Sequence, residues 1–229
     1  MRPAIFALGA AAGCWSLPAL SPHAPRLADA LGIERRVDSA EGIALTFDDG
    51  PHPLGTPAVL DVLAREQATA TFFLVGEQVE RDPALAREIV AAGHAVALHG
   101  HRHRNLLRLT PSQLRDDVDR VSAVVADTTG AAPAVYRPPY GIFSAAGLAM
   151  VRRRGWRPVL WSRWGRDWRR RATAASIAAD AARGPAPGDV VLLHDADTYS
   201  ARDSWQRTVA ALPAVLEAVH EAGLRTVRI

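Results

Sequence analysis

Residues 43–51 read IALTFDDGP, and this stretch indicates the kind of fold. Its first five residues are apolar, β-branched or aromatic, which is typical of a short buried strand. Two adjacent carboxylates, Asp48 and Asp49, follow the strand directly. Thr56-Pro57 then begins a helix, because Thr is a good N-cap and Pro suits the first helical position. The stretch predicts a strand, an acidic loop and a helix, which is the repeating unit of α/β proteins.

The same unit recurs along the chain. Strands are expected at 43–47, 70–75, 94–98, 134–136, 157–161, 190–193 and 224–227. Helices are expected after 56, after 75 up to about 92, over 110–126, over 144–155, after 173 and after 204. Such alternation predicts a parallel sheet. Because the chain has no dinucleotide-binding glycine fingerprint, we predict a distorted (β/α) barrel of about seven parallel strands in a single domain, not an open doubly wound sheet.

Composition excludes several classes of protein. The 229 residues are 48% hydrophobic, enough for one sizeable core, and the net charge is only +3. A single cysteine, Cys14, excludes an intrachain disulfide and a cysteine-rich zinc site. No basic motif interleaved with aromatic residues is present, so we expect no nucleic-acid partner. The arginine runs 152–154 and 169–171 are typical of solvated faces, and the alternative is contact with phosphates or an acidic polymer.

Residues 1–40 form an N-terminal apolar segment that begins MRPAIFALGAAAGCWSLPAL. The apolar run has the length of a signal-peptide core, and the ADA triplet at 28–30 resembles a cleavage site. The run is short for a membrane span. We expect export or membrane association through this segment, slightly favoured over a cytoplasmic location. The alternative is an N-terminal helix packed on the domain. We expect a monomer.

Five unusual motifs lie where predicted strands end. They are TFDDG at 46–50, HGHRH at 99–103, RPPYG at 137–141, WGRDW at 164–168 and LLHD at 192–195. In parallel α/β folds, sites are built at the carboxyl ends of the strands. Core packing alone does not explain five such motifs at one end of the sheet, so we predict a functional site there.

Spacing separates the three clustered histidines. In an extended strand, the Cα atoms of His99 and His103 would be about 13 Å apart, too far for easy sharing of one ion. If the chain turns helically, these two side chains share a face and His101 falls about 200° away. We therefore predict that His99 and His103 ligate together, with His101 at the rim or pointing away.

The adjacent carboxylates complete a candidate metal site. Neighbouring side chains point to different sides, so one of Asp48 and Asp49 can ligate an ion while the other faces a bound water. Two histidines and one carboxylate leave coordination positions open, as in a catalytic ion. Zinc is the divalent metal that we expect, and cobalt and nickel also fit.

Two further residues have a functional and a structural interpretation. Arg137 precedes two prolines, and this stiff loop can aim the guanidinium at a carboxylate or present a backbone N–H to an oxyanion. The alternative is a structural arginine on a rigid turn. His194 ends a buried strand, where it is either a proton donor to a leaving group or a buried structural histidine.

Taken in order, the five motifs resemble those of the polysaccharide deacetylases with NodB homology, carbohydrate esterase family four. The resemblance runs from about residue 42 to the C-terminus, so residues 41–229 would be the catalytic domain. It implies a distorted barrel with fewer units than a full TIM barrel. It also implies a metal-dependent hydrolase that removes N-acetyl groups from an amino-sugar glycan or glycolipid.

The resemblance also implies a role for each matching residue. Asp49, His99 and His103 would hold the metal. Asp48 would be the general base, and Arg137 would hold it in place. Tyr140 would give its backbone N–H to the oxyanion, and His194 would be the general acid. The pocket for the acetyl methyl would be walled by Trp168 and Leu192.

Two departures from the family pattern bear on these roles. The family's fourth motif usually begins with an Asp that tunes the catalytic histidine, and here that position is Trp164. Asp167, Asp195 and Asp197 are the candidates to replace it. Between the ligand histidines, residues 100–102 read GHR in place of small hydroxyl residues, which bears on the rim and the substrate.

The motifs leave the substrate open. Chitin oligomers, peptidoglycan of the cell wall, surface polysaccharide and lipid-linked sugars all carry N-acetyl groups. An O-acetyl esterase or a cyclic-amide hydrolase would use the same site, and a non-catalytic glycan-binding protein could keep the fold.

Overall fold

The computed structural model describes residue 13 and residues 15–229, and in it the chain forms one sheet curled into a distorted half-barrel. The strands run in the order β5-β4-β3-β2-β1-β7-β6, and β8 pairs with the first part of β1. Every pair of these strands is parallel, which confirms the predicted fold class. The strands are β1 (Gly42–Asp48), β2 (Thr71–Leu74), β3 (Ala95–Leu98), β4 (Val135–Tyr136), β5 (Arg157–Pro158), β6 (Arg163–Trp164), β7 (Val190–His194) and β8 (Arg225–Val227).

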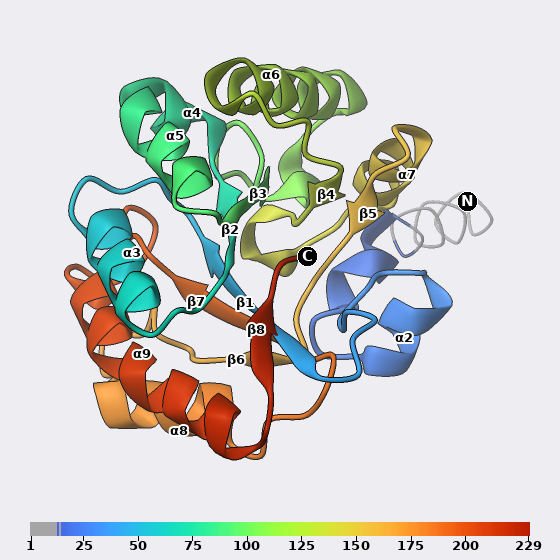
Figure 1. The fold of residues 1–229 in the computed structure, drawn as a ribbon. Coiled ribbons are helices and arrows are strands. Elements are labelled where there is room, and N and C mark those ends of the chain that lie inside the picture. Colours follow the sequence, from blue (N-terminus) through green and yellow to red (C-terminus); the bar gives the residue numbers. More distant parts are fainter. Residues whose placement is uncertain (1–12, 14) are drawn as a thin grey trace.

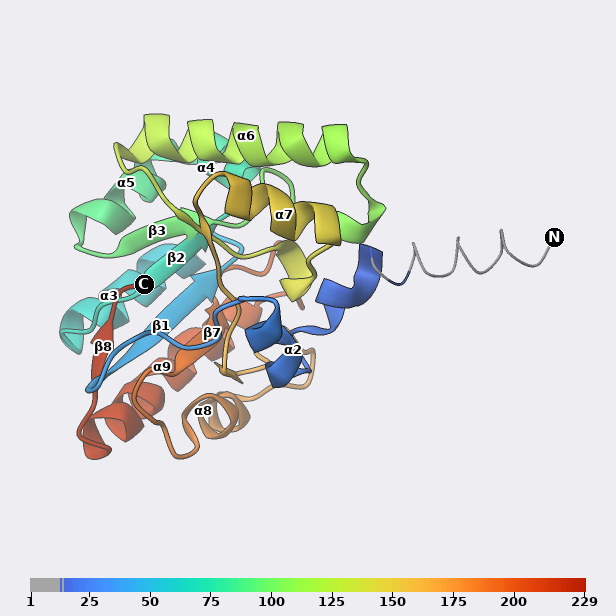
Figure 2. The same cartoon turned by 90° about the vertical axis from the view of Figure 1, so that its right-hand side faces the viewer.

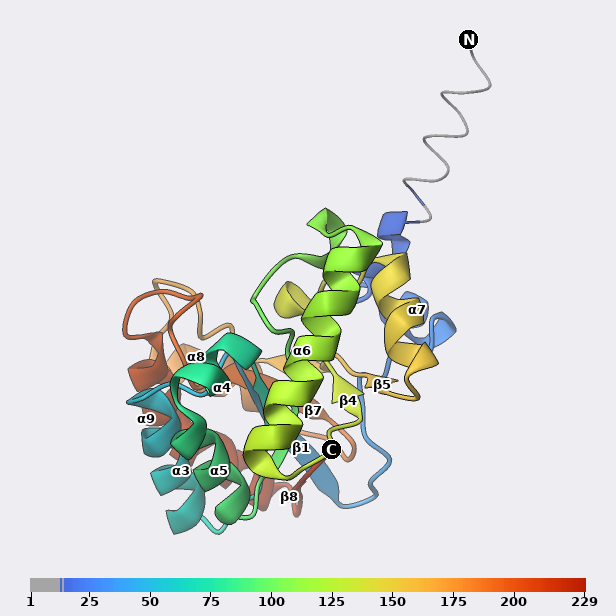
Figure 3. The same cartoon turned by 90° about the horizontal axis from the view of Figure 1, so that it is seen from above.

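Helices surround the sheet, as Figure 1 shows in a view along the barrel. They are α2 (Pro25–Ala30), α3 (Gly55–Arg65), α4 (Gly76–Arg81), α5 (Pro83–Ala91), α6 (Pro111–Thr129), α7 (Ala145–Arg153), α8 (Ala174–Ala182) and α9 (Ser204–Glu221). Three short 3-10 helices are η1 (Leu17–Leu20), η2 (Leu106–Arg108) and η3 (Pro139–Gly141). Figures 2 and 3 show that the long helix α6 lies across the outside of the barrel between α4 and α7.

The register of the central strands brings two motifs together. All seven residues of β1 are buried, and so are the first four of β7, because both strands lie in the middle of the sheet. In the parallel pairing of β1 with β7, Asp48 lies beside His194. On its other side, Asp48 lies beside Phe73 of β2. The end of β1 is therefore the centre of the predicted site.

Residues before the first strand fill the gap between β5 and β7. Glu34 forms a bridge to Val159, and Arg36 forms one to Asp189. Ile33 is buried in the main core, as is Ala28 of the ADA triplet. The boundary at residue 40 stays a prediction. The apolar run at 1–12 and Cys14 lie outside the described residues. Among the described residues, no helix has both the length and the apolarity to cross a membrane.

Several predicted boundaries shift. The helix expected up to residue 92 is two helices, α4 and α5, because Pro83 cannot continue the first and Asp82 instead caps the second. The strand expected at 157–161 shortens to β5, since the N–H of Leu160 donates to the Glu34 carbonyl and not to a neighbouring strand.

Most of the predicted helix starts agree with the structure, but the one at Thr56 does not. Thr110 begins α6 where a helix was expected, and it forms a capping box with Gln113. Ser144 and Thr173 cap α7 and α8, which begin where helices were expected. The prediction for Thr56 is wrong, because α3 begins at Gly55 and the Thr56 hydroxyl bonds to the His52 N–H and the Asp195 carboxylate.

Candidate active site

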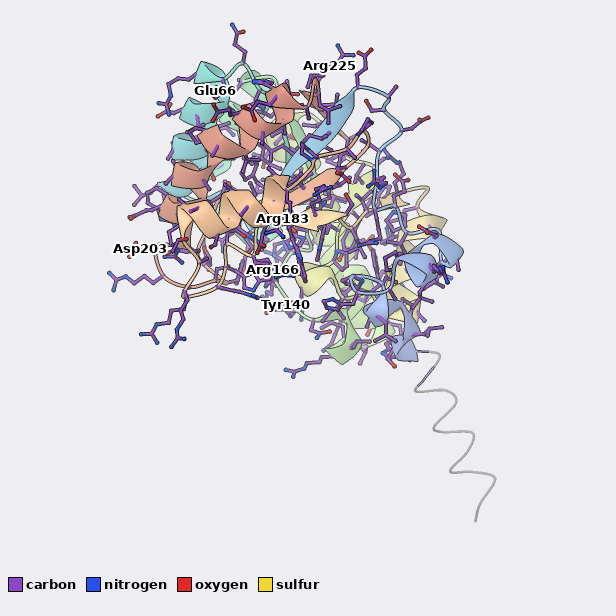
Figure 4. All side chains as sticks on the ribbon, turned by 90° about the horizontal axis from the view of Figure 1, so that it is seen from below. Glu66, Tyr140, Arg166, Arg183, Asp203 and Arg225 are labelled. Atoms are coloured by element: carbon purple, nitrogen blue, oxygen red, sulfur yellow. The ribbon has the colours of Figure 1, made fainter. Side chains whose placement is uncertain are left out.

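The predicted site residues meet in one pocket of about 240 Å³ at the carboxyl ends of the strands. Its lining comprises Asp48, Asp49, His99, His103, Tyr140, Gly141, Trp161, Trp164, Trp168, Leu192, His194, Tyr199 and Ser200. Figure 4 shows the labelled Tyr140, at the mouth, toward the end of the molecule opposite Glu66 and Arg225. Arg137 and Asp167 lie behind this lining and are fully buried.

Three side chains form a candidate metal site. Asp49, His99 and His103 offer ligand atoms that all lie within 4.8 Å of one another. The Oδ1 atom of Asp49 lies 3.4 Å from Nε2 of His99 and 3.2 Å from Nε2 of His103. This buried oxygen has no hydrogen bond of acceptable geometry, although both ring nitrogens are close. The three atoms therefore converge on a common point without satisfying one another.

The tautomer of His99 supports a cation at that point. Its Nδ1 lies 2.9 Å from the carbonyl oxygen of Arg137, which can only accept, so Nδ1 carries the proton. In the neutral form, which is the form that ligates metals, Nε2 presents a lone pair toward the Asp49 carboxylate. A lone pair facing a carboxylate is repulsive unless a cation lies between them, and a backbone carbonyl on the other ring nitrogen is common for histidine ligands. The residues present thus fit a divalent metal.

The chain between the two histidines turns by a different route from the expected helical turn. Gly100 has a φ of +78° and the segment forms a bend, which brings the rings of His99 and His103 to 5.4 Å between centroids. Asp117 of α6 holds this bend, because its carboxylate accepts hydrogen bonds from the N–H groups of His101 and Arg102 at 2.8 and 3.3 Å. Joint placement of the two histidines therefore depends on glycine and on a distant carboxylate.

His101 does not belong to the metal site. Its side chain points away toward α4, where Nε2 lies 3.7 Å from the Glu80 carboxylate. It is 4% exposed, so the alternative placement at the rim is wrong.

Asp48 is held by Arg137 from inside the barrel. The Nη1 group of Arg137 donates to Asp48 Oδ1 at 2.6 Å and to Thr46 Oγ1 at 2.9 Å. The guanidinium also lies 3.8 Å above the ring of Phe73 and donates through Nη2 to the Leu160 carbonyl at 2.9 Å. Burial lowers the pKa of Arg137 and the charge of Asp48 opposes this, so the two groups form a buried ion pair.

Asp167 is the partner of His194. Its carboxylate lies 2.9 Å from Nδ1 of His194 and accepts the backbone N–H of the same residue at 2.7 Å. A third hydrogen bond comes from the Thr208 hydroxyl at 2.8 Å. Among the three candidate carboxylates, Asp167 is the one that contacts the His194 ring. Asp195 instead bonds to Thr56, and Asp197 pairs with His52.

His194 and Asp49 each shift the pKa of the other in favour of its charged form. Burial by itself lowers the pKa of His194, but the negative charges of Asp167, Asp49 and Asp48 outweigh it and raise the pKa to about 10. Burial by itself raises the pKa of Asp49. The closely placed rings of His103 and His99 and the charge of His194 outweigh that effect and hold the pKa well below its usual range.

Aromatic side chains wall the rest of the pocket. Trp164, which replaces the family's usual Asp, lies between Trp161 and Trp168 with ring centroids 5.6 and 5.4 Å away. Trp168 meets the His194 ring edge-on at 5.5 Å. Leu192 lies in the same wall and is 3% exposed. Tyr140 has a φ of +61° and is 56% exposed at the mouth.

Tyr199 is a pocket residue that the sequence did not reveal. Its ring stacks on His103 with centroids 4.2 Å apart and planes 11° from parallel. Its hydroxyl donates to Glu77 at 2.6 Å and accepts from Gln78 at 2.9 Å. Tyr199 lies in the loop after LLHD, which has no periodicity that would assign it a contact.

Comparison with known proteins identifies the family. Residues 35–159 match the description "Polysaccharide deacetylase", over more than half of the chain. The "Chitooligosaccharide deacetylase" of Bradyrhizobium sp. (strain ANU 289) is 38% identical over 198 residues, which is 82% of this chain and 88% of that protein. The chain therefore belongs to the polysaccharide deacetylase family.

Solved structures agree with this assignment. The crystal structure of a peptidoglycan N-acetylglucosamine deacetylase in complex with 4-naphthalen-1-yl-N-oxidanyl-benzamide is similar, with a TM-score of 0.78 and 30% identity over 86% of this chain and 89% of that one. A family 4 acetyl xylan esterase from Clostridium thermocellum, in complex with a cobalt ion, has a TM-score of 0.74 and 29% identity over 81% of this chain and 87% of that one. The predicted family and fold are thus confirmed.

Proposed function

We propose that this protein is a metal-dependent hydrolase that removes N-acetyl groups from an amino-sugar glycan or glycolipid. The observation that carries the proposal is the convergence of Asp49, His99 and His103 in one pocket with Asp48 and His194. Ligands, a base and an acid thus surround one small cavity. The activities named for the similar deacetylases support the choice of N-acetyl groups.

Asp49, His99 and His103 are the residues that would hold the metal. A bound divalent ion supplies Lewis acidity, which lowers the pKa of a water molecule and polarises a carbonyl. We propose zinc, because two imidazoles and one carboxylate with open positions suit catalytic zinc. The cobalt ion in the similar acetyl xylan esterase supports cobalt as a functional substitute, and nickel suits the same donors.

Asp48 is the proposed general base. Its Oδ1 atom is held by Arg137, while its Oδ2 atom lies 3.7 Å from Nε2 of His99 and so faces the metal site. One oxygen is thus fixed and the other is available to take a proton from the attacking water. The oxygen of that water forms a bond to the acetyl carbonyl carbon, and the backbone N–H of Tyr140 would stabilise the resulting oxyanion.

His194 is the proposed general acid. It lines the same pocket as His99 and His103, with Nε2 4.0 Å from Asp49 Oδ2. Asp167 fixes the ring through Nδ1, so Nε2 can deliver a proton to the amide nitrogen as the C–N bond breaks. The products are acetate and a free sugar amine. Trp168 and Leu192 would hold the acetyl methyl group against the apolar wall.

An O-acetyl esterase is the second candidate, and the similarity to an acetyl xylan esterase favours it over a cyclic-amide hydrolase. The same base and oxyanion donor would serve an ester, whose leaving alcohol needs protonation less than an amine does. For either activity, we propose that residues 41–229 are the catalytic domain.

Acetate release tests the proposal directly. N-acetylglucosamine oligomers and O-acetylated xylan oligomers are incubated with the protein, with and without chelator, and after zinc, cobalt or nickel is added back. We expect metal-dependent acetate release from the N-acetylated oligomers. Release only from the O-acetylated oligomers would replace the proposal with the esterase, and no release from either by metal-loaded protein would contradict both.

A further inference from the structure

Three consecutive arginines adjoin the pocket wall. Trp168 lines the pocket, and Arg169, Arg170 and Arg171 follow it directly. We call Arg169, Arg170 and Arg171 the arginine cluster. Consecutive Cα atoms are about 3.8 Å apart, so the Cα atom of Arg169 lies about that far from the Cα atom of Trp168. All three side chains are exposed, and together they line a separate surface hollow.

In the part of the chain that the structure describes, the arginine cluster has no acidic ion-pair partner. Within the described residues, none of its three side chains forms an ion pair, whereas nearby Arg166 pairs with Asp180 at 3.8 Å. Arg166 belongs to the same segment, two residues before Trp168. Three unpaired guanidinium groups next to a substrate pocket produce a local positive potential.

The segment that carries the cluster is fixed to the protein. The Trp168 carbonyl accepts a hydrogen bond from the Ala201 N–H at 3.2 Å. The Arg169 carbonyl accepts from the Ala172 N–H at 3.0 Å and from Nη2 of Arg207 at 3.4 Å. These bonds tie the start of the arginine cluster to the loop after β7 and to α9, and Asp167 of the same segment bonds to His194.

We propose that Arg169, Arg170 and Arg171 form a binding site for an anionic group, a carboxylate or a phosphate, on the glycan substrate beside the sugar that is deacetylated. Guanidinium groups bind both oxyanions through paired N–H donors. The inference rests on the proposed deacetylase function and narrows its substrate to acidic glycans. The favoured substrate would carry its charge outside the pocket, because the pocket itself is walled by aromatic rings and closed by the metal site.

The chain offers a matched control. Residues 152–154 are also three arginines, but they lie where α7 ends and β5 is about to begin, at the amino ends of the strands. Replacing either run by glutamine changes the net charge equally, and only one run lies beside the pocket. The two triple variants are Arg169→Gln/Arg170→Gln/Arg171→Gln and Arg152→Gln/Arg153→Gln/Arg154→Gln. Thermal unfolding verifies that both remain folded.

The test compares three substrates of similar length by acetate release. They are a neutral N-acetylglucosamine oligomer, an oligomer that alternates N-acetylglucosamine with carboxylate-bearing N-acetylmuramic acid, and an N-acetylglucosamine oligomer with a terminal phosphate. For wild-type protein we expect kcat/KM to be highest on one or both acidic oligomers and to fall with added salt. For the 169–171 variant we expect a loss of roughly tenfold on the acidic oligomer, through KM, and almost no change on the neutral one.

The outcomes separate the two proposals. Activity of the wild-type protein on the neutral oligomer, with equal activity of both triple variants on all three substrates, would overturn the anion site and leave the deacetylase proposal standing. Equal losses of the 169–171 variant on acidic and neutral oligomers would also overturn it. The acidic oligomer on which the 169–171 variant loses activity identifies the bound anion as carboxylate or phosphate.

Discussion

Nη1 of Arg137 lies 2.6 Å from Oδ1 of Asp48, and both side chains are buried. This ion pair gives the two adjacent aspartates different environments. Asp48 is bound to a cation from inside the barrel, whereas Asp49 faces two ring nitrogens across the site. The fold, and not the residue type, therefore distinguishes the proposed ligand Asp49 from the proposed base Asp48.

Replacing Arg137 with Met should be strongly destabilising. The variant leaves the Asp48 charge buried without its partner, which typically costs about 3–5 kcal/mol of unfolding free energy. Chemical denaturation with a fluorescence readout measures the loss. The double variant Arg137→Met/Asp48→Asn should recover part of it, and a double variant no more stable than the single one would argue against the ion pair as the cause.

The histidines should separate in a metal-binding experiment. His99→Ala or His103→Ala removes one of the three converging ligand atoms, so we expect zinc affinity to fall by at least about 100-fold. His101→Ala, which changes a buried side chain outside the site, should keep the ion. Equilibrium dialysis of the metal-free proteins against zinc measures both. Loss of zinc from the His101 variant, with its fold intact, would contradict the two-histidine assignment.

Asp167→Asn should lower kcat much more than it changes KM. The carboxylate fixes the His194 ring and stabilises its protonated form, so we expect a loss on the order of 10² to 10⁴ in kcat. Asp197→Asn is the matched control, because Asp197 pairs with His52 and not with His194. Steady-state acetate release distinguishes them, and equal losses in both variants would count against Asp167 as the partner.

Asp195 should make stability depend on pH. The pKa of Asp195 is raised to about 7, mainly by burial and also by the negative charge of Asp49. A hydrogen bond from Thr56 and the positive charge of His194 offset part of this rise. Because the pKa in the folded protein lies above the ordinary 3.8, folding favours the protonated acid. The resulting stability is complete below about pH 3.8, is lost as the pH rises toward 7 and changes no further above it.

Asp195→Asn mimics the protonated acid and removes this dependence. Its unfolding free energy, relative to wild type, should rise by about 2 kcal/mol between pH 5 and pH 8. Urea denaturation at both pH values measures the difference, in which contributions from titrating groups that do not interact with Asp195 cancel. A difference that stays constant or falls with pH would show that Asp195 is ionised in the folded protein throughout this range.

The metal site is the part of the structure that sequence reasoning predicted best. The four-residue spacing of His99 and His103 limited the candidate histidine ligands to a pair, and the strand-end carboxylates Asp48 and Asp49 offered the third ligand. The choice of Asp49 over Asp48 came from the family resemblance. The route of the chain between the histidines was not predictable, because it depends on the positive φ of Gly100 and on Asp117, which is distant in sequence.

Other contacts could not be predicted from the sequence, because they also join residues that are distant along the chain. Three carboxylates were equally placed to replace the missing Asp at Trp164, and only the tertiary fold selects Asp167. Tyr199 reaches His103 from an irregular loop. Glu34 takes a place between β5 and β7 from a segment whose composition indicated only an apolar leader or helix. Local patterns predict strands and helices, but they do not specify pairings between distant loops.

The most direct test of the account combines zinc content and acetate release for Asp48→Asn and Asp49→Asn. Both variants remove one negative charge from neighbouring buried positions, so they control for each other. We predict that Asp48→Asn binds one zinc ion per chain but releases almost no acetate from N-acetylglucosamine oligomers, whereas Asp49→Asn loses the zinc. If Asp48→Asn loses the zinc, or keeps the activity of the wild-type protein, the proposed division between base and ligand is contradicted.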